Sequence, residues 1–152
     1  MFDCATLLRE INDFSEVKKT YKEIVKIELA YRELNIDYKE VLLDTIKSAA
    51  VIIGRGSLYK SDEIAVYSTG IRAIGSHLLS KKYDFAIAGF DAAQVMYLAS
   101  SILSDSNDFS LIKDTSDYND CKIENKDFSS LSSLRKISLD TYAYIVEATK
   151  LL

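Results

Sequence analysis

Two side chains near the middle of the chain have types and a spacing that allow acid–base chemistry on a phosphodiester. Arg72 and His77, the one histidine among the 152 residues, are separated by four residues. A histidine can transfer protons near neutral pH, and an arginine can hold a phosphate through paired hydrogen bonds. These two residue types together allow a phosphate to be bound and a proton to be transferred beside it. The structural alternative is a surface arginine beside a partly buried, hydrogen-bonded histidine.

Other catalytic and metal-binding patterns are missing from the sequence. Cys4, Cys121 and one histidine supply too few ligands for a four-ligand zinc site. The Asp- and Asn-rich runs after residue 104 lack the glycine and the twelfth-position glutamate of a calcium-binding EF-hand loop. Gly54 and Gly56 are not followed by the Lys–Ser/Thr pair of a phosphate-binding loop. We therefore predict no metal ion and no cofactor.

The charge of the chain is acidic and unevenly distributed. Nineteen Lys and Arg against 23 Asp and Glu give a net charge of −4, whereas nucleic-acid binders usually carry a basic excess. Residues 105–127 hold seven acids and three lysines, so this segment alone accounts for the excess. One local basic cluster remains, and it predicts either a solvated helix face or a nucleic-acid contact within a nucleoprotein complex. Its members are Lys18, Lys19, Lys22 and Lys26.

The elements that must position these side chains are helices. The chain has no proline and five glycines, which favours long helices over turn-rich β structure. Apolar residues at spacings of three and four predict about six helices in an all-α, single-domain bundle of antiparallel helical hairpins. One long acidic loop is expected at 105–127. The predicted helices are a short one over 7–11 and longer ones over 16–34, 38–53, 61–78, 83–103 and 128–152.

The sequence also predicts which helix is central and where two of the helices begin or end. The helix over 83–103 is lined by alanine and glycine, which let a neighbouring helix approach closely, so it is predicted to be the central and most buried one. Ser15 is expected to cap the helix over 16–34, and Gly54 to end the helix over 38–53. Residues Ser80 to Lys82 are expected to form a short, tight connection.

The run Lys82 to Ala93 resembles the second helix of a tetratricopeptide repeat. Tyr83, Ala86, Phe90 and Ala93 fall where that family places its aromatic and small residues. The preceding helix departs from the pattern, because Gly75 lies one position away from the expected small residue and the closing proline is missing. The resemblance over residues 61–104 implies a helical hairpin that recognises proteins.

The same hairpin is similar to that of the HEPN superfamily, which includes ribonuclease toxins. Enzymatic members carry an arginine followed a few residues later by a histidine, and here Arg72 and His77 match that motif. The motif lies ahead of the small-residue helix, whereas the family places it nearer the C-terminal side. The resemblance implies a metal-independent ribonuclease with these two catalytic residues.

The remaining features favour an intracellular partner protein. No secretory signal and no apolar run of membrane-spanning length are recognised, and two cysteines far apart indicate free thiols, so we expect a cytoplasmic location. The first hypothesis is a non-enzymatic module of adaptor, chaperone, antitoxin or immunity type that binds a protein or a second copy of itself. Tyrosine is favoured in recognition surfaces, and the candidate binding residues are Tyr59, Tyr67, Tyr97 and Tyr142.

Overall fold

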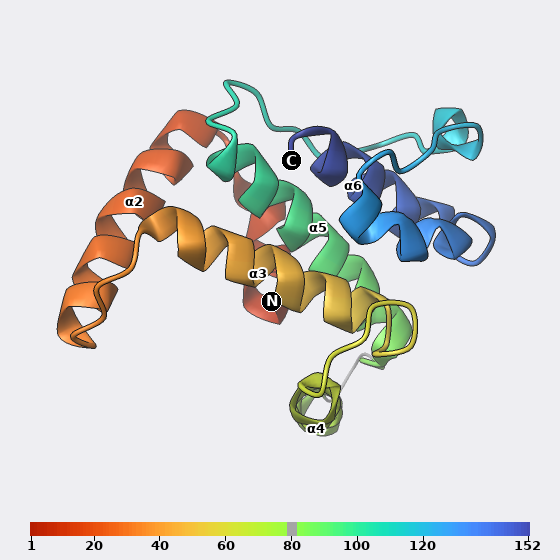
Figure 1. Ribbon diagram of the computed structural model, residues 1–152, viewed down its shortest axis with the longest axis horizontal. Coiled ribbons are helices and arrows are strands. Elements are labelled where there is room, and N and C mark those ends of the chain that lie inside the picture. The colour runs from red at the N-terminus through yellow and green to blue at the C-terminus, as the bar shows by residue number, and fades with distance from the viewer. Residues whose placement is uncertain (79–81) are drawn as a thin grey trace.

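The computed structural model describes residues 1–78 and 82–152 (Figure 1). Within these ranges the protein contains α-helices and 3₁₀ helices and no strand, which confirms the all-α class. The α-helices are α1 (Phe2–Leu7), α2 (Phe14–Tyr31), α3 (Tyr38–Ile53), α4 (Ile64–His77), α5 (Phe85–Leu103) and α6 (Leu139–Lys150). The 3₁₀ helices are η1 (Leu8–Glu10), η2 (Ser116–Asn119) and η3 (Lys126–Lys136).

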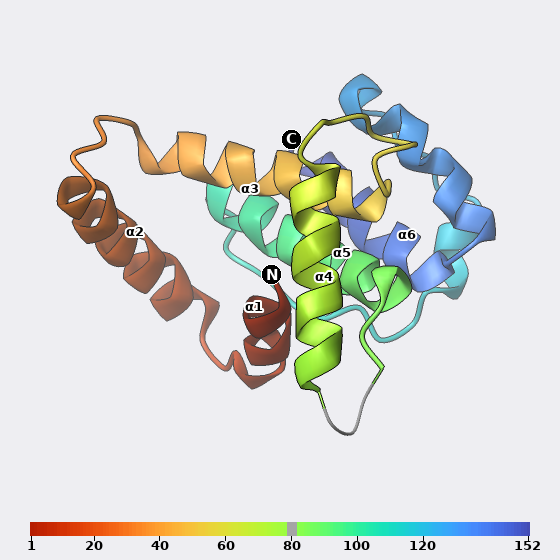
Figure 2. The ribbon, with the colours of Figure 1, turned by 90° about the horizontal axis from the view of Figure 1, so that it is seen from below.

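Helix α5 forms the centre of the core, as its small residues predicted. It packs antiparallel to α3 on one side and against α6 on the other (Figures 1 and 2). Ala92 and Ala93 of α5 and Ala49 and Ala50 of α3 are fully buried. A side chain at Gly89 would begin 3.8 Å from the Cα of Ile53, so α3 and α5 are in close contact there.

The same helix is long and apolar enough to cross a membrane by length and composition. It is the one such helix among the described residues. Two-thirds of its apolar window, 67%, is buried inside the protein. Core packing therefore accounts for the apolar composition of α5.

Aspartates begin three of the long helices. Asp37 accepts a hydrogen bond from the backbone of α3, and Asp84 accepts two from the backbone of α5. Asp13 accepts from the amides of Ser15 and Glu16, so α2 begins at Phe14 and its cap is Asp13 rather than the predicted Ser15. The first helix also lies earlier than predicted, because α1 ends at Leu7 and only the short η1 follows.

Helices α2, α3 and α5 end in the same turn. In each, a residue with left-handed backbone follows the last helical turn: Glu33 (φ 55°), Arg55 (φ 52°) and Asp105 (φ 54°). The amide of the residue after it then donates a hydrogen bond to the carbonyl five residues earlier. In α2 the amide of Leu34 donates to the carbonyl of Leu29 at 2.9 Å. This is the Schellman arrangement, which usually has glycine at the left-handed position. Gly54 is the C-cap of α3, as predicted, and Arg55 takes the left-handed position that follows it.

Helix α4 crosses the layer formed by α3 and α5 instead of lying along α5 (Figure 2). Of its side chains only Ile71 is buried. The α4 backbone comes close to the chain before α5, since a Cβ at Gly75 would lie 2.8 Å from the carbonyl oxygen of Tyr83. Most of the tight connection expected at Ser80–Lys82 lies outside the described residues.

The predicted single helix over 128–152 is wrong, because two elements occupy the segment. Phe128, Leu131 and Leu134 are buried at spacings of three, which places them on one face of the 3₁₀ helix η3. Ser138 then starts a new helix, α6, by accepting a hydrogen bond from the amide of Thr141. Serines at 129, 130, 132 and 133 weaken the α-helical preference of the first half.

Hydrogen bonds of two tyrosine hydroxyls hold the acidic segment 105–127 against the core. The Tyr142 hydroxyl donates to the carbonyl of Cys121 at 3.0 Å, and the Tyr144 hydroxyl accepts from the amide of Ile112 at 3.1 Å. Phe109 adds an apolar contact, with its ring centroid 5.0 Å from that of Tyr97. Several of the ten tyrosines thus serve to hold this segment in place.

Candidate functional site

Arg72 and His77 lie on α4, and both side chains are exposed. Five helical steps turn a side chain by about 500°, so the two point in directions about 140° apart around the helix. Neither residue lines any of the grooves found among the described residues. The structure therefore does not bring the predicted catalytic pair together in one site.

The four candidate tyrosines occupy separate places and share no surface. Tyr142 is 1% exposed and belongs to the core, so it cannot contact a partner. The ring of Tyr97 packs beside those of Phe109 and Tyr144.

The other two candidates have partners within the fold. The ring of Tyr59 stacks on Phe128 with centroids 5.8 Å apart. The oxygen of the Tyr67 hydroxyl lies 2.9 Å from that of Ser48, and the hydroxyl donates to Glu63. These rings are half-buried and complete the edges of the core.

The lysine cluster of α2 is divided between two roles. Lys18 and Lys22 place their ammonium groups 3.3 and 3.5 Å from the carboxylate of Asp105. The hydrogen bond and charge of Lys18, with the charge of Lys22, hold the pKa of Asp105 below its usual value. Lys19 and Lys26 are exposed, and neither has an ion-pair partner in the described chain. Two of the four lysines are therefore paired with the carboxylate of Asp105 within the fold.

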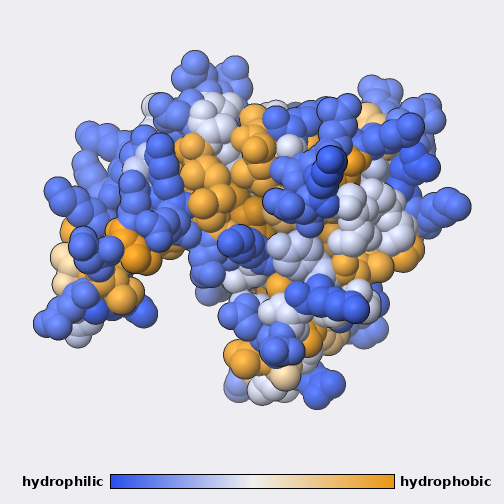
Figure 3. Space-filling model, viewed as in Figure 1, coloured by the Kyte–Doolittle hydropathy of each residue, from blue (hydrophilic) through white to orange (hydrophobic). Residues whose placement is uncertain are grey.

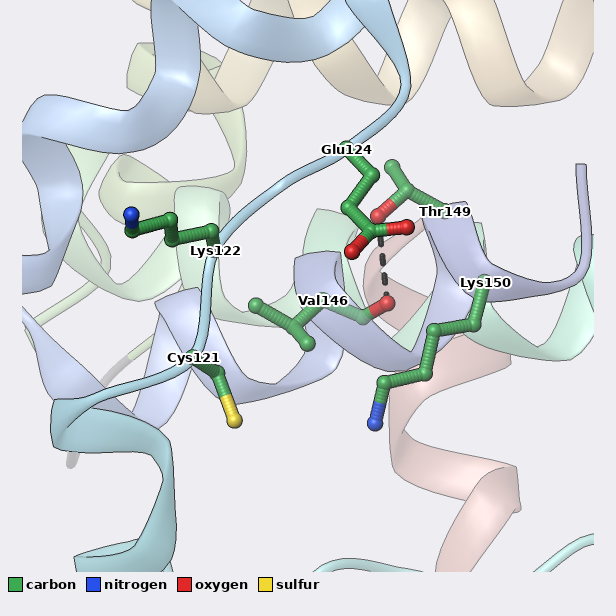
Figure 4. A pocket seen from close by; sticks show the side chains of 6 residues that line it. All are labelled: Cys121, Lys122, Glu124, Val146, Thr149 and Lys150. Atoms are coloured by element: carbon green, nitrogen blue, oxygen red, sulfur yellow. Dashed lines mark hydrogen bonds between the residues drawn. The ribbon is translucent and has the colours of Figure 1, made fainter.

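A polar hollow of about 430 Å³ lies between the acidic segment and the end of α6 (Figure 4). The thiol of Cys121 bonds to the carbonyl of Asp117 at 3.5 Å, and the Thr149 hydroxyl donates to the carbonyl of Val146 at 3.1 Å. The ammonium group of Lys150 donates a hydrogen bond to the carboxylate of Glu147 at 2.6 Å. Across the described chain no group of three His, Cys, Asp or Glu side chains is placed to hold a metal ion. Cys121 and Thr149 thus donate to backbone carbonyls, and Lys150 pairs with a neighbouring side chain of α6.

The second half of α2, the turn after it and the first half of α3 form a projection with an unusually apolar surface. In both ribbon views this part extends away from the core (Figures 1 and 2). We call residues 24–44 the arm. In the described chain eleven large apolar side chains are exposed, and six of them lie on the arm: Ile24, Ile27, Tyr31, Leu34, Ile36 and Leu43.

Ile27 and Tyr31 are the most exposed side chains of this set. Their exposed fractions are 67% and 85%. Apolar atoms gather at the tip of the arm, at the left of the space-filling view, with hydrophilic atoms around them (Figure 3). The arm thus presents a concentrated apolar surface to solvent.

The inner side of the arm forms a groove of about 440 Å³ between α2 and α3. We call it the elbow groove. Its apolar lining consists of Val25, Leu29, Leu34, Ile36 and Val41, and its charged rim of Glu28, Arg32, Glu40 and Asp44. The rim is net acidic, and Arg32 is paired with Glu28 at 3.6 Å.

A second groove, of about 520 Å³, lies on the other side of α2, against α1 and η1. Its apolar lining includes Leu7, Ile11, Val17 and Ile24, and its acids are Glu10, Asp13 and Glu16. Tyr21 also lines it; burial raises the pKa of this tyrosine to about 12, and its hydroxyl has no hydrogen-bond partner among the described residues. Apolar grooves with acidic rims therefore flank α2 on both sides.

Comparison of the chain with protein-family models, curated proteins and solved structures finds no match. The candidate site is therefore defined by geometry alone. The sequence carried one signal of it, because α2 has apolar residues on two faces: Val25 and Leu29 on one, Ile24 and Ile27 on the other. A helix of a small protein with two apolar faces has more than one surface to cover.

Proposed function

We propose that this protein is a non-enzymatic cytoplasmic interaction module, of adaptor, chaperone, antitoxin or immunity type, that binds a partner protein through the arm. The observation that carries the proposal is the gathering of six exposed apolar side chains on residues 24–44. Apolar side chains that gather on one exposed part of a protein usually mark an interaction site, because leaving them in water is unfavourable. Burial of that surface against a partner would remove the penalty.

The arrangement of the arm adds to this argument. The first half of α2, which precedes the arm, is anchored by Lys18 and Lys22 to Asp105, whereas residues 30–37 at the tip of the arm are all exposed. A helix that projects in this way buries little of its own apolar surface. Its side chains are thus available to a partner without prior unfolding.

A pair of matched substitutions tests the proposal. Ile27→Asp places a charge on the arm, and Val66→Asp places the same charge on α4 at a side chain of similar exposure, 71% against 67%. Both positions lie on exposed helix faces, so both variants should fold. Tagged wild-type protein and the two variants are used to capture partners from native extract, with and without nuclease treatment.

The proposal expects a nuclease-resistant protein partner that Ile27→Asp loses and Val66→Asp retains. Equal capture by all three proteins would overturn the arm as the binding site. Nuclease-sensitive capture of RNA or DNA would instead favour a subunit of a nucleoprotein complex. Cleavage of RNA by the wild-type protein without metal, lost on His77→Ala, would favour the ribonuclease hypothesis.

A further inference from the structure

We propose that the elbow groove binds a basic amphipathic helix of the partner protein. This inference rests on the proposed function and specifies the chemistry of the partner. It is drawn from the shape of the groove, from the charges on its rim and from the way these charges would repel a second copy of this chain.

The groove has the form that receives one face of a helix. Helices α2 and α3 make its two walls, and Glu33, in left-handed backbone, reverses the chain so that Leu34 lines the groove together with Leu29. Ile36 and Val41 complete the apolar lining. An amphipathic helix places apolar residues at i, i+3, i+4 and i+7 into such grooves.

The rim defines the charge of the occupant. Three carboxylates and one guanidinium surround the apolar lining. Glu40 and Asp44 lie one turn apart on α3, and neither has an ion-pair partner in the described ranges. Lysines or arginines beside the apolar face of a bound helix would meet these two acids, and complementary charge gives both attraction and specificity.

A second copy of the chain is a poorer occupant. A two-fold symmetric contact places the same patch on both sides, so the acids of one rim would face those of the other. Like charges placed together disfavour association. The exposed lysines of the arm do not offset this, because Lys26 lies about 100° around α2 from Val25 and Lys39 about 160° around α3 from Val41.

Two labelled synthetic peptides test the inference by fluorescence anisotropy. One contains leucines at i, i+3, i+4 and i+7 with lysines elsewhere, and the other has glutamate in place of each lysine. We expect the lysine peptide to bind wild-type protein about tenfold or more tightly than the glutamate peptide. The double variant Glu40→Gln/Asp44→Asn should weaken the lysine peptide several-fold and reduce the salt dependence of its binding.

Two further variants give this experiment its controls. Asp108→Asn/Asp120→Asn removes the same charge from exposed positions of the acidic segment and should leave binding unchanged. Leu34→Asp, at a half-exposed side chain, should abolish binding while circular dichroism confirms the helical fold.

Three outcomes would overturn the inference. They are equal binding of both peptides, binding that survives Leu34→Asp, and a concentration-dependent dimer in sedimentation that Leu34→Asp dissociates. The last would assign the groove to a second copy. If Ile27→Asp still abolishes capture of a cellular partner, failure with the peptides removes the basic helix and leaves the proposed function intact.

Discussion

The ammonium group of Lys18 lies 3.3 Å from the carboxylate of Asp105 and joins the base of α2 to the turn that follows α5. Lys18 is 14% exposed and also donates to the carbonyl of Ser106 at 2.7 Å. Asp105 has left-handed backbone, and in this Schellman turn at the end of α5 its carboxylate faces α2. The anchor holds the first half of α2 and leaves the tip of the arm free.

Replacing Asp105 by asparagine should loosen this anchor. Asparagine tolerates left-handed backbone, so Asp105→Asn removes the charge without straining the turn. We expect amide hydrogen exchange to become faster over residues 17–22 and to stay unchanged in α3. Asp108→Asn, in the same acidic segment, is the control and should change neither region. Unchanged exchange at 17–22 in Asp105→Asn would show that other contacts hold the base of α2.

The stability that the ion pair of Asp105 with Lys18 and Lys22 contributes should depend on pH in one direction. Lys18 and Lys22 lower the pKa of Asp105 from 3.8 in the folded state, so its ionised form stabilises the fold above that pH. The contribution should be lost as the pH falls through the lowered value. We expect the difference in unfolding free energy between wild type and Asp105→Asn to be constant from neutral pH to about pH 5 and to shrink below about pH 4. A difference that grows on acidification would contradict the anchor.

The long core helices could be predicted because local signals agree with packing. The predicted bounds of α3, 38–53, match the structure, since Asp37 caps the helix and its apolar face is regular. The C-terminal segment could not be predicted in the same way. Phe128, Leu131 and Leu134 fit either an α-helix or a 3₁₀ helix by spacing, and burial against the core determines which of them forms.

Glycine at position 33 should stabilise the protein. Glu33 has a φ of 55°, where a side chain is unfavourable and glycine is not. We expect Glu33→Gly to raise the unfolding free energy by about 0.5–1 kcal/mol in urea denaturation, after the greater freedom of glycine in the unfolded chain is deducted. Ala30→Gly, three residues earlier within α2, is the matched control and should destabilise by up to about 1 kcal/mol. A loss of stability in both variants would mean that the turn is not the favoured end of α2.

The candidate site was less predictable than the fold. Apolar spacing in α2 indicates a buried face, but it does not say whether the neighbour belongs to the same chain. Ile24 and Ile27 satisfy the same pattern as Ile46 and Ala50 of α3, yet only the residues of α3 find a neighbour within this fold. The abundance of tyrosine was also ambiguous. Tyr142 and Tyr144 use their hydroxyls to hold the acidic segment, a long-range contact that local sequence does not encode.

The role of Tyr142 as a core residue gives the final prediction. Its hydroxyl donates to the carbonyl of Cys121 at 3.0 Å, so Tyr142→Phe leaves that carbonyl without this donor. We expect a loss of about 1 kcal/mol of unfolding free energy in urea denaturation. Tyr97→Phe is the control, because no hydrogen bond of the Tyr97 hydroxyl is found in the described chain, and it should change stability by much less. Both variants should bind the arm's partner as wild type does. Equal stability of the two variants would show that the acidic segment does not depend on this bond, and loss of partner binding in Tyr142→Phe would return Tyr142 to the binding surface.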